Sequence, residues 1–275
     1  MIALICASLL AQGSLIDPGD VSGVFGSLDD RIYIEGELPW LFTIWPSGRH
    51  LTLPHDNPPM VFGADEHGAL VYQVGVAGRD DLGIEYEFLN WFPEPDIYRI
   101  RGEWAIGFGQ AHEPLKLFHR GIYVCSWNRP YDFRYGLSVN PTNGSVAMAL
   151  FDHGQLRIRI GTPSRTHPHL SAWRTVKFTG AHPVEVLRRY EFAGKHHLLC
   201  GLVYHVPPYD SKCILTDIDI RSFETKPLAT LSFKLSVEPQ ELDPNLFCIT
   251  STSVFFLSHE GVRKLILPKS YYSER

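Results

Sequence analysis

Four short stretches of the chain carry polar side chains of types that do acid–base chemistry or hold an anion. In chain order they contain Asp29 and Arg31, Asn90 and Trp91, His182 in a turn of small residues, and His205 with Tyr209. A carboxyl group serves as a general acid when burial raises its pKa. An arginine can hold a phosphate group through two parallel hydrogen bonds. These residue types therefore predict a polar site, provided that the fold brings the four stretches together.

The elements that must position these residues are short strands. Apolar runs rich in Val, Ile, Leu, Tyr and Phe alternate with turn residues, and 23 glycines and 20 prolines leave little room for long helices. Residues 40–54 and 60–74 each predict a hairpin, residues 135–160 predict three strands, and residues 253–267 predict two more. Residues 182–192 are the best helical candidate, although this segment also fits a strand.

Groups of strands and turns recur about every 50 residues, which is near the upper end of propeller-blade periods. The groups cover residues 21–78, 79–131, 132–181, 182–238 and 239–268. We therefore predict that residues 1–275 form a single all-β domain, a five-bladed β-propeller. The last group is short of strands, and residues 2–16 can supply the missing one, closing the ring and removing an exposed sheet edge. In a propeller the ends of the inner strands meet at the central channel, which would bring the four polar stretches together.

Charge and cysteine content narrow the classes of partner and compartment. The net charge is −5, the pI is about 6.2 and no long run of Lys or Arg occurs, so nucleic acid and anionic membrane are not expected as partners. The five cysteines form no CxxC pair, which favours a cytoplasmic protein, although Cys200 and Cys213 are close enough in sequence to pair across a hairpin. The alternative is secretion, with residues 1–13 as a signal peptide that lacks its usual basic residue.

The order of the four stretches resembles that of the five-bladed β-propellers of the β-mannoside phosphorylases and related glycoside hydrolases. The matching pieces are Leu28-Asp29-Asp30-Arg31-Ile32, Asn90-Trp91-Phe92-Pro93, Gly180-Ala181-His182-Pro183-Val184, and Tyr204-His205 with Tyr209. Residues 246–267 resemble the last blade of that family, so the likeness spans about residues 27–268. The chain departs from the pattern at Leu28, where the family has an acidic residue, and at His182, where it has threonine or serine.

The resemblance implies an inverting glycosidase or a glycoside phosphorylase that acts on a saccharide or glycoside ligand. Asp29 falls at the acid that protonates the leaving oxygen, Arg31 lies beside it, and His205 falls where phosphate or a sugar would bind. Asn90, Trp91, His182 and Tyr209 complete the implied set of ligand-binding residues. No cofactor or metal ion is implied, and phosphate is expected only as a co-substrate of a phosphorylase.

A second hypothesis is a non-catalytic propeller that binds a protein or glycan partner. Asp29 and Asp30 also fit an ordinary turn, and a histidine at a strand end, such as His205, often has a structural hydrogen-bonding role. The tryptophans fit either sugar contacts or packing between blades. Those considered for sugar contacts are Trp40, Trp45, Trp91 and Trp104. The scattered histidines lack metal-ligand spacing, which predicts no metal site.

Overall fold

The structure, a computed structural model, describes residues 12–16, 23–28, 30–36, 41–52, 61–65, 70–72, 75–77, 97–107, 114–128, 135–178, 180–206, 210–231, 246–258 and 261–271. Within these ranges the chain is all-β, as the sequence predicts, and a single 3₁₀ turn, η4 (Lys269–Tyr271), is the only helical element. Runs of β-branched and aromatic residues form the strands, and Gly, Pro, Asn and Asp end them.

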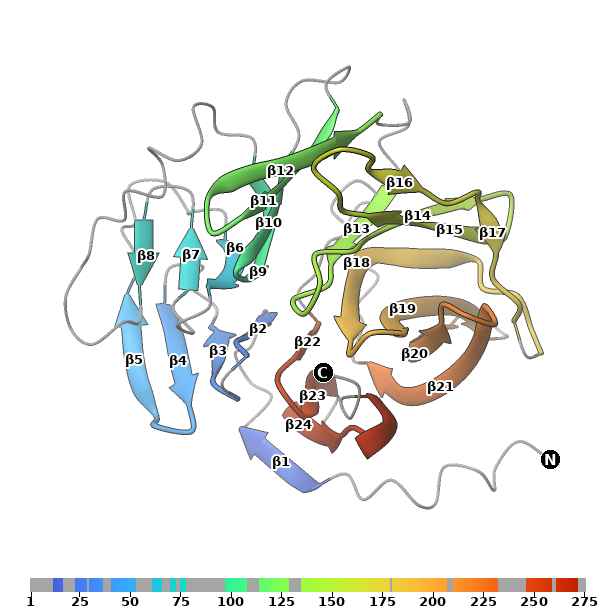
Figure 1. Ribbon diagram of the computed structural model, residues 1–275. Coiled ribbons are helices and arrows are strands. Elements are labelled where there is room, and N and C mark those ends of the chain that lie inside the picture. Colours follow the sequence, from blue (N-terminus) through green and yellow to red (C-terminus); the bar gives the residue numbers. More distant parts are fainter. Residues whose placement is uncertain are drawn as a thin grey trace.

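The strands pair antiparallel in groups that follow the chain (Figure 1). The first group is β2 (Gly23–Gly26), β3 (Ile32–Glu35), β4 (Leu41–Trp45) and β5 (Arg49–Thr52). The second is β6 (Val61–Asp65), β7 (Leu70–Tyr72) and β8 (Gly75–Ala77). The third is β9 (Ile97–Gly102), β10 (Trp104–Gly107), β11 (Leu115–His119) and β12 (Ile122–Trp127).

Three further groups complete the described strands. The fourth is β13 (Tyr135–Val139), β14 (Val146–Asp152), β15 (Gln155–Thr162), β16 (His169–Leu170) and β17 (Arg174–Thr175). The fifth is β18 (Glu185–Ala193), β19 (His197–Val206), β20 (Asp210–Asp219) and β21 (Glu224–Leu231). The sixth is β22 (Phe247–Ile249), β23 (Ser253–Ser258) and β24 (Gly261–Ile266), with β1 (Gln12–Ile16) on its outer side.

The first strands of the six groups form a ring. They contact one another in the cyclic order β2, β6, β9, β13, β18, β22 and back to β2. Two of these neighbours, β6 with β9 and β13 with β18, also pair in parallel. A ring of antiparallel groups whose first strands run side by side at the centre is a β-propeller, and each group is one blade.

The expected count of five blades is not confirmed, because the described strands fall into six groups. Residues 21–78 were expected to form one blade, but they contain two antiparallel groups, β2–β5 and β6–β8, that share no strand pairing. The strands within residues 21–78 have only three to five residues each. Two groups of them therefore fit into an interval about as long as the one that a single group of longer strands fills later in the chain.

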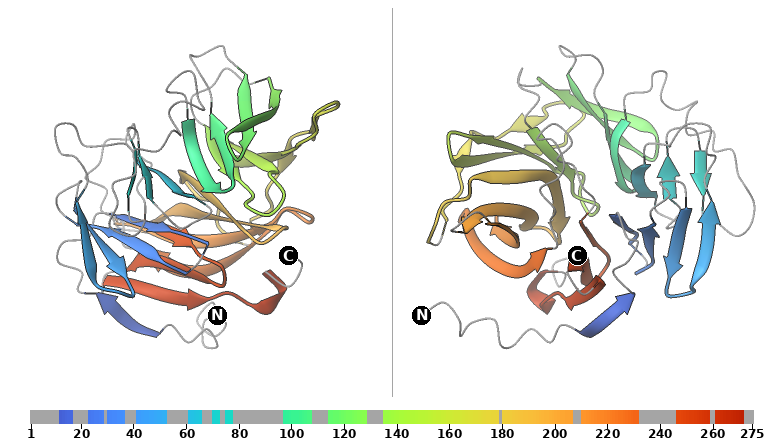
Figure 2. Two further views of the ribbon diagram at one scale, coloured as in Figure 1. Left: turned by 60° about the vertical axis from the view of Figure 1, so that its left-hand side comes forward. Right: turned by 180° about the vertical axis from the view of Figure 1, so that it is seen from behind.

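The N-terminal strand closes the ring, as the sequence predicts. β1 pairs antiparallel with β24, with Gln12 opposite Lys264 and Ile16 opposite Val262. Figure 2 shows β1 alongside the C-terminal strands in both views. The sheet therefore runs β1, β24, β23, β22, with strands from both ends of the chain. Residues 1–11 lie outside the described part, so the choice between a strand and a signal peptide there stays a prediction.

In the part of the chain that the structure describes, apolar clusters lie between neighbouring blades. Leu156 of β15 and Phe192 of β18 belong to one apolar cluster, between the fourth and fifth blades. Leu117 of β11 and Met148 of β14 belong to another, between the third and fourth blades. Burial on both faces also explains why the segment 182–192, the best helical candidate, forms the strand β18 instead.

The chain ends its described course by docking onto the fifth blade. Tyr271 of η4 is 5% exposed, its phenol donates a hydrogen bond to Asp217 Oδ2, and its ring stacks on His197 at 3.8 Å between centroids. His197 Nδ1 lies 3.0 Å from the same carboxylate oxygen. Gly194 has a φ of +71°, and a Cβ atom there would lie 1.4 Å from the Tyr271 carbonyl oxygen, so this approach requires glycine.

The described cysteines are buried free thiols. They are Cys125, Cys200, Cys213 and Cys248. Cys200 and Cys213, which lie close enough in sequence to pair across a hairpin, are therefore not bridged: Cys200 stands opposite Thr216 and Cys213 opposite Val203. Burial raises the pKa of Cys213 to about 12, so this thiol packs as a small apolar side chain.

Candidate functional site

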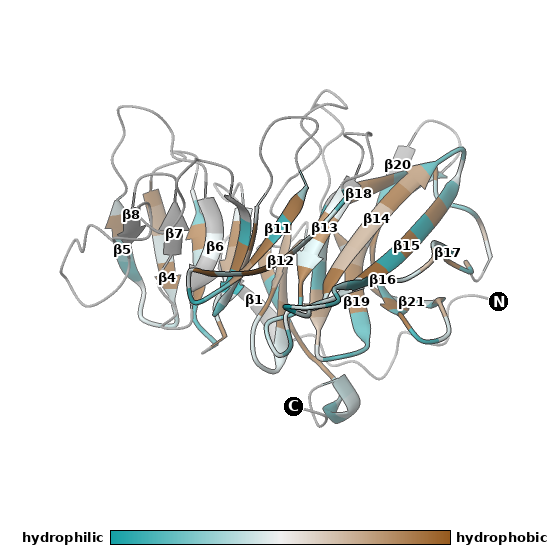
Figure 3. Cartoon of the chain, turned by 45° about the horizontal axis from the view of Figure 1, so that its top comes forward, coloured by the Kyte–Doolittle hydropathy of each residue, from teal (hydrophilic) through white to brown (hydrophobic). Residues whose placement is uncertain are grey.

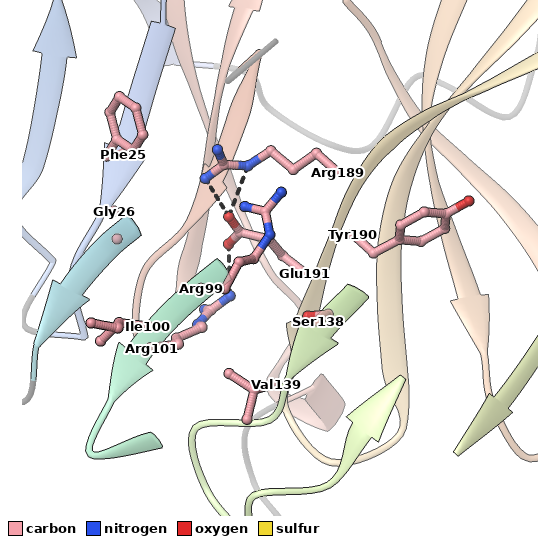
Figure 4. A pocket seen from close by; sticks show the side chains of 11 residues that line it. Phe25, Gly26, Arg99, Ile100, Arg101, Ser138, Val139, Arg189, Tyr190 and Glu191 are labelled. Atoms are coloured by element: carbon pink, nitrogen blue, oxygen red, sulfur yellow. Dashed lines mark hydrogen bonds and ion pairs between the residues drawn. The ribbon is translucent and has the colours of Figure 1, made fainter. Parts of the chain in front are cut away.

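A small cavity lies at the centre of the ring, where the first strands of the blades approach one another (Figure 4). Its lining comes from β2, β6, β9, β13 and β18, and its volume is about 30 Å³. The charged side chains that line it are Arg99, Arg101, Arg189 and Glu191, and we call these four residues the channel cluster. Since a water molecule needs roughly 10–15 Å³ of such space, the cavity has room for about two waters or a small anion.

Glu191 is the hub of the channel cluster. Arg101 Nη1 donates a hydrogen bond to Glu191 Oε2 at 2.6 Å, and Arg189 donates from Nε at 3.0 Å and from Nη2 at 2.5 Å to Oε1. The backbone amide of Ile249, in β22, donates to Oε2 at 3.1 Å, and Arg101 Nη2 donates to the Ile249 carbonyl at 3.1 Å. One carboxylate thus connects β9, β18 and β22.

The electrostatics of the channel cluster keep Glu191 ionised. Its side chain is 10% exposed, and those of Arg189 and Arg101 are 5% and 13% exposed. Burial works to raise the pKa of the Glu191 carboxyl, but the guanidinium groups of Arg189, Arg101 and Arg99 together hold it below its ordinary value. The desolvation cost of this buried carboxylate is offset because both oxygens accept charge-assisted hydrogen bonds.

Strand periodicity places these side chains. Arg99 and Arg101 are two residues apart on β9, as Arg189 and Glu191 are on β18, so the members of each pair leave the strand on the same side. The side chain of Tyr190 leaves β18 on the other side, away from the carboxylate (Figure 4). The parallel pairing of β6 with β9 and of β13 with β18 then fixes the level of each pair in the ring.

The sequence reasoning missed the channel cluster. The available signal was a pair of charged residues alternating with apolar ones inside a strand, in IYRIRG (97–102) and in RRYEF (188–192). A strand of a propeller is covered on both faces, so charges inside it must meet partners or line the channel. Residues 101 and 191 are 90 positions apart, and only the ring topology brings them into contact.

Several predicted site residues lie outside the described part of the chain. They are Asp29, Asn90, Trp91 and Tyr209. Arg31, His182 and His205 are described, and their places can be compared. The role of each predicted residue in ligand binding or catalysis stays a prediction.

Arg31 lies at the end of the ring where the first strands finish. Its neighbour Asp30 has a φ of +67° in the β2–β3 turn and accepts hydrogen bonds from the amide of Ser251 at 3.1 Å and its hydroxyl at 2.6 Å. Ser251 follows Ile249, the last residue of β22, whose amide binds Glu191. Burial works to raise the pKa of Asp30, but these hydrogen bonds and others nearby lower it, so this carboxylate fastens a turn.

His182 and His205 lie at the opposite end of the ring. His182 precedes the start of β18, and His205 is near the end of β19, whose Val203 stands opposite Glu185 at that start. The strand from Glu185 to Glu191 spans roughly 20 Å at about 3.3 Å per residue. Both histidines are exposed. The structure therefore brings these two histidines to one end of the fifth blade but does not bring them together with Arg31.

The described tryptophans considered for sugar contacts pack against side chains of the protein. Trp45 lies against Phe255 of β23, in the sixth blade, at 5.2 Å between ring centroids. Trp104 stacks on His119 at 4.3 Å, and a Cβ atom at Gly144 would lie within 2.4 Å of its ring. These contacts match the packing interpretation. Trp40 and Trp91 lie outside the described residues.

Comparison with known proteins agrees with the propeller fold. The chain is similar to the structure of a gluconolactonase from Xanthomonas campestris, with a TM-score of 0.58 and 10% identity over 97% of this chain and 93% of that one. It is also similar to virginiamycin B lyase from Staphylococcus aureus, with a TM-score of 0.44 and 12% identity over 94% of this chain and 99% of that one. The Dos1 propeller gives a TM-score of 0.42 and 9% identity over 90% of this chain and 78% of that one.

These likenesses concern the fold, because the identities are near 10%. The protein is a β-propeller, and the β-mannoside phosphorylase type is not confirmed. No family model matches the chain, and no curated protein matches it. Among the described residues no three His, Cys, Asp or Glu side chains gather as metal ligands would. In the same residues, no helix is long and apolar enough to cross a membrane.

Proposed function

We propose that the protein is a non-catalytic β-propeller that binds a protein partner through its surface. The observation that carries this proposal is the state of Glu191, the carboxylate at the centre of the ring. A general acid must hold a proton near neutral pH, which requires a raised pKa. Two hydrogen-bonded guanidinium groups lower the pKa of Glu191 instead, so this group serves as a fixed anion between blades.

The size of the central cavity supports the same proposal. A volume of about 30 Å³ accepts water or a small anion but not a sugar ring. Arg101 bridges β9 to both Glu191 and the Ile249 carbonyl, so enlarging the cavity from this side would break several buried hydrogen bonds at once. In this proposal the channel cluster holds the blades together, and recognition takes place on the outer surface.

The test is a ligand screen by thermal shift with phosphate, mannose-type sugars and sugar phosphates. We expect none of them to raise the melting temperature. A ligand at 100 times its Kd would stabilise the native state by about 2.7 kcal/mol, which the method detects easily. A concentration-dependent rise with any sugar or sugar phosphate would overturn the non-catalytic proposal.

A glycoside hydrolase or phosphorylase is the second candidate. It is favoured by the motif resemblance around Asp29 and by the nature of one similar structure, a gluconolactonase of glucose metabolism. In this case Asp29 is the general acid, Arg31 its neighbour, and phosphate the co-substrate of a phosphorylase. Asn90, Trp91, His182, His205 and Tyr209 would contribute to ligand binding.

The separating experiment for the second candidate is Asp29→Asn, assayed with nitrophenyl glycosides and with mannosyl disaccharides plus phosphate. An enzyme would lose turnover by about 10²-fold or more, while its melting temperature stays unchanged. The matched control is Asp30→Asn, which removes the charge from the carboxylate bound to Ser251 and should affect stability rather than turnover. Absence of turnover in the unchanged protein would remove this candidate.

A further inference from the structure

The outer edge of the fourth blade carries an unusual concentration of positive charge. Residues 153–184 contain five basic side chains and no Asp or Glu, whereas the rest of the chain holds the remaining 20 basic and all 30 acidic side chains. The five basic residues, which we call the basic edge, are Arg157, Arg159, Arg165, Arg174 and Lys177. A protein with a net charge of −5 therefore has one blade whose outer part is locally positive.

The fold places the basic edge along the outer strands of the fourth blade and the segments beside them. Arg157 and Arg159 lie two residues apart on β15 and so on one side of that strand. β17 pairs with β15 so that Arg174 stands opposite Ile158, and its side chain therefore leaves the sheet on the other face from those of Arg157 and Arg159. Arg165, Arg174 and Lys177 are exposed. Figure 3 shows hydrophilic positions along β15 and β16 on the outside of the molecule.

Acidic residues lie beside two members of the basic edge: Asp152 beside Arg157, and Glu224, whose backbone bridges that of Lys177. Arg157 Nη2 lies 4.0 Å from Asp152 Oδ2, and the other oxygen of this carboxylate lies 3.6 Å from His153 Nε2. Among the described residues no acidic side chain forms an ion pair with Arg165, Arg174 or Lys177. Exposed cations without an ion-pair partner along the edge of one blade create a local positive potential that attracts an anionic partner.

Aromatic rings hold two of these arginines in place. The Arg174 guanidinium carbon lies 4.3 Å from the Phe223 ring centroid, and that of Arg159 lies 4.6 Å from the Trp173 centroid. Phe223 is buried, so its ring is a fixed platform. A guanidinium group stacked on a ring still presents N–H donors at its edge. Because the ring already restricts its rotamers, binding costs less side-chain entropy.

We propose that the basic edge is the docking surface for an acidic segment, rich in Asp and Glu, of a partner protein. This inference rests on the proposed function and names the partner's chemistry. Four of the five cations are arginines, which suits bidentate pairing with carboxylates. A nucleic acid is a poorer fit because Arg159 occupies a face of Trp173 on which a base would stack.

The test measures binding of a fluorescein-labelled peptide of alternating Asp and Glu by fluorescence polarisation, at low and at physiological salt. A Gln/Asn peptide and a single-stranded oligonucleotide of equal length are measured in parallel. We expect the acidic peptide alone to bind, and its affinity to fall about tenfold between roughly 50 and 200 mM salt, as for any contact between exposed charges.

Charge reversal at Arg165→Glu with Lys177→Glu should weaken peptide binding by about tenfold or more. The matched control is Lys195→Glu with Lys212→Glu, which changes the net charge equally at exposed positions of the fifth blade and should leave affinity within about twofold. Equal losses in both variants would show that binding follows net charge, and would overturn the proposal.

Two other outcomes would overturn it as well. One is no binding of the acidic peptide at low salt, and the other is tighter binding of the oligonucleotide that the Arg165 and Lys177 reversal abolishes. Either result leaves the non-catalytic propeller standing, because the sugar screen tests that proposal separately. Conversely, a sugar-induced thermal shift would overturn the proposed function while leaving the peptide isotherm as the measure of the basic edge.

Discussion

Arginine serves two different purposes in the centre and at the rim of this propeller. In the channel, Arg101 and Arg189 are almost fully buried and surround one carboxylate. On the fourth blade, Arg165 and Arg174 are exposed, and no ion pair involves them among the described residues. The residue type alone therefore does not determine the role of an arginine. A buried guanidinium group is structural, whereas a solvated one is available for binding.

The largest effect on folding is expected from the deletion of the outer strand β1, although single substitutions at the rim are expected to have small effects. Deleting residues 2–16 removes β1 and exposes the pairing edge of β24. We expect insoluble protein, because an open edge next to an apolar blade promotes aggregation. Soluble expression and size-exclusion chromatography provide the measurement. Deleting residues 2–11, which keeps β1, is the control and should remain soluble; a folded, soluble 2–16 deletion would refute closure by β1.

Glu191→Gln should be the most damaging single substitution in the channel. It leaves the buried guanidinium groups of Arg101 and Arg189 without their anion, which costs about 3–5 kcal/mol in the free energy of unfolding. Urea denaturation followed by tryptophan fluorescence measures this. Glu185→Gln, at an exposed position of the same strand, is the control and should change stability by about 0.5 kcal/mol or less.

The pH dependence sharpens this prediction. The pKa of Glu191 in the folded protein lies below its ordinary value of 4.5, so its stabilisation is complete above that pH and is lost as the pH falls through the lower folded value. The stability gap between the unchanged protein and Glu191→Gln should therefore narrow as the pH is lowered from 5 towards 3, by about 1.4 kcal/mol per unit of pKa shift. A gap that stays constant over this range would contradict the ionised hub.

Tyr271→Phe tests an intermediate case, a buried contact at the periphery. The substitution removes the phenol that donates to Asp217 while keeping the ring stacked on His197. Since hydrogen bonds to charged groups contribute about 1.5–3 kcal/mol, we expect a loss of that size in thermal or urea unfolding. Tyr123→Phe, which removes an exposed hydroxyl bound to Ser126, should cost about 0.5 kcal/mol or less. Equal effects of the two would mean that η4 is not docked.

The smallest effects belong to the basic edge. Arg165→Gln should change the free energy of unfolding by about 0.5 kcal/mol or less, as exposed substitutions do. Arg174→Gln should cost about 0.5–1 kcal/mol because it also loses its contact with the Phe223 ring. Parallel urea titrations measure both. If either variant destabilised the protein as much as Glu191→Gln, the distinction between centre and rim would not hold.

The fold could be predicted from the sequence further than the site could. Strand patterns and turn residues are local, so the all-β propeller and its closure by an N-terminal strand followed directly from them. The blade count is not confirmed, because turns alone do not tell whether a hairpin such as 61–72 ends one blade or begins the next. The segment 182–192 was ambiguous because a strand covered on both faces loses its period-two pattern.

The site depended on contacts that no local pattern contains. Arg101 and Glu191 meet only because the chain from the third to the fifth blade follows a ring, and their strands look like ordinary apolar runs with a few charges. The predicted residues were chosen at turns, and turns occur at both ends of a propeller. Arg31 and His205 therefore lie at opposite ends of the ring, although the ends of the inner strands were predicted to converge.

The hydrogen bonds between Glu191, Arg101 and the backbone of Ile249 join β9 to β18 and β22, which are not its neighbours around the ring. In proteins built from repeated units, usually only adjacent units interact, so one unit can open at a time. The hydrogen bonds of Glu191 remove that freedom, because opening the blade of β9, β18 or β22 would leave a buried charged group without one of its hydrogen-bond partners. The Ile249 amide should then exchange its proton with solvent as slowly as the most protected sites in the molecule, through global opening alone.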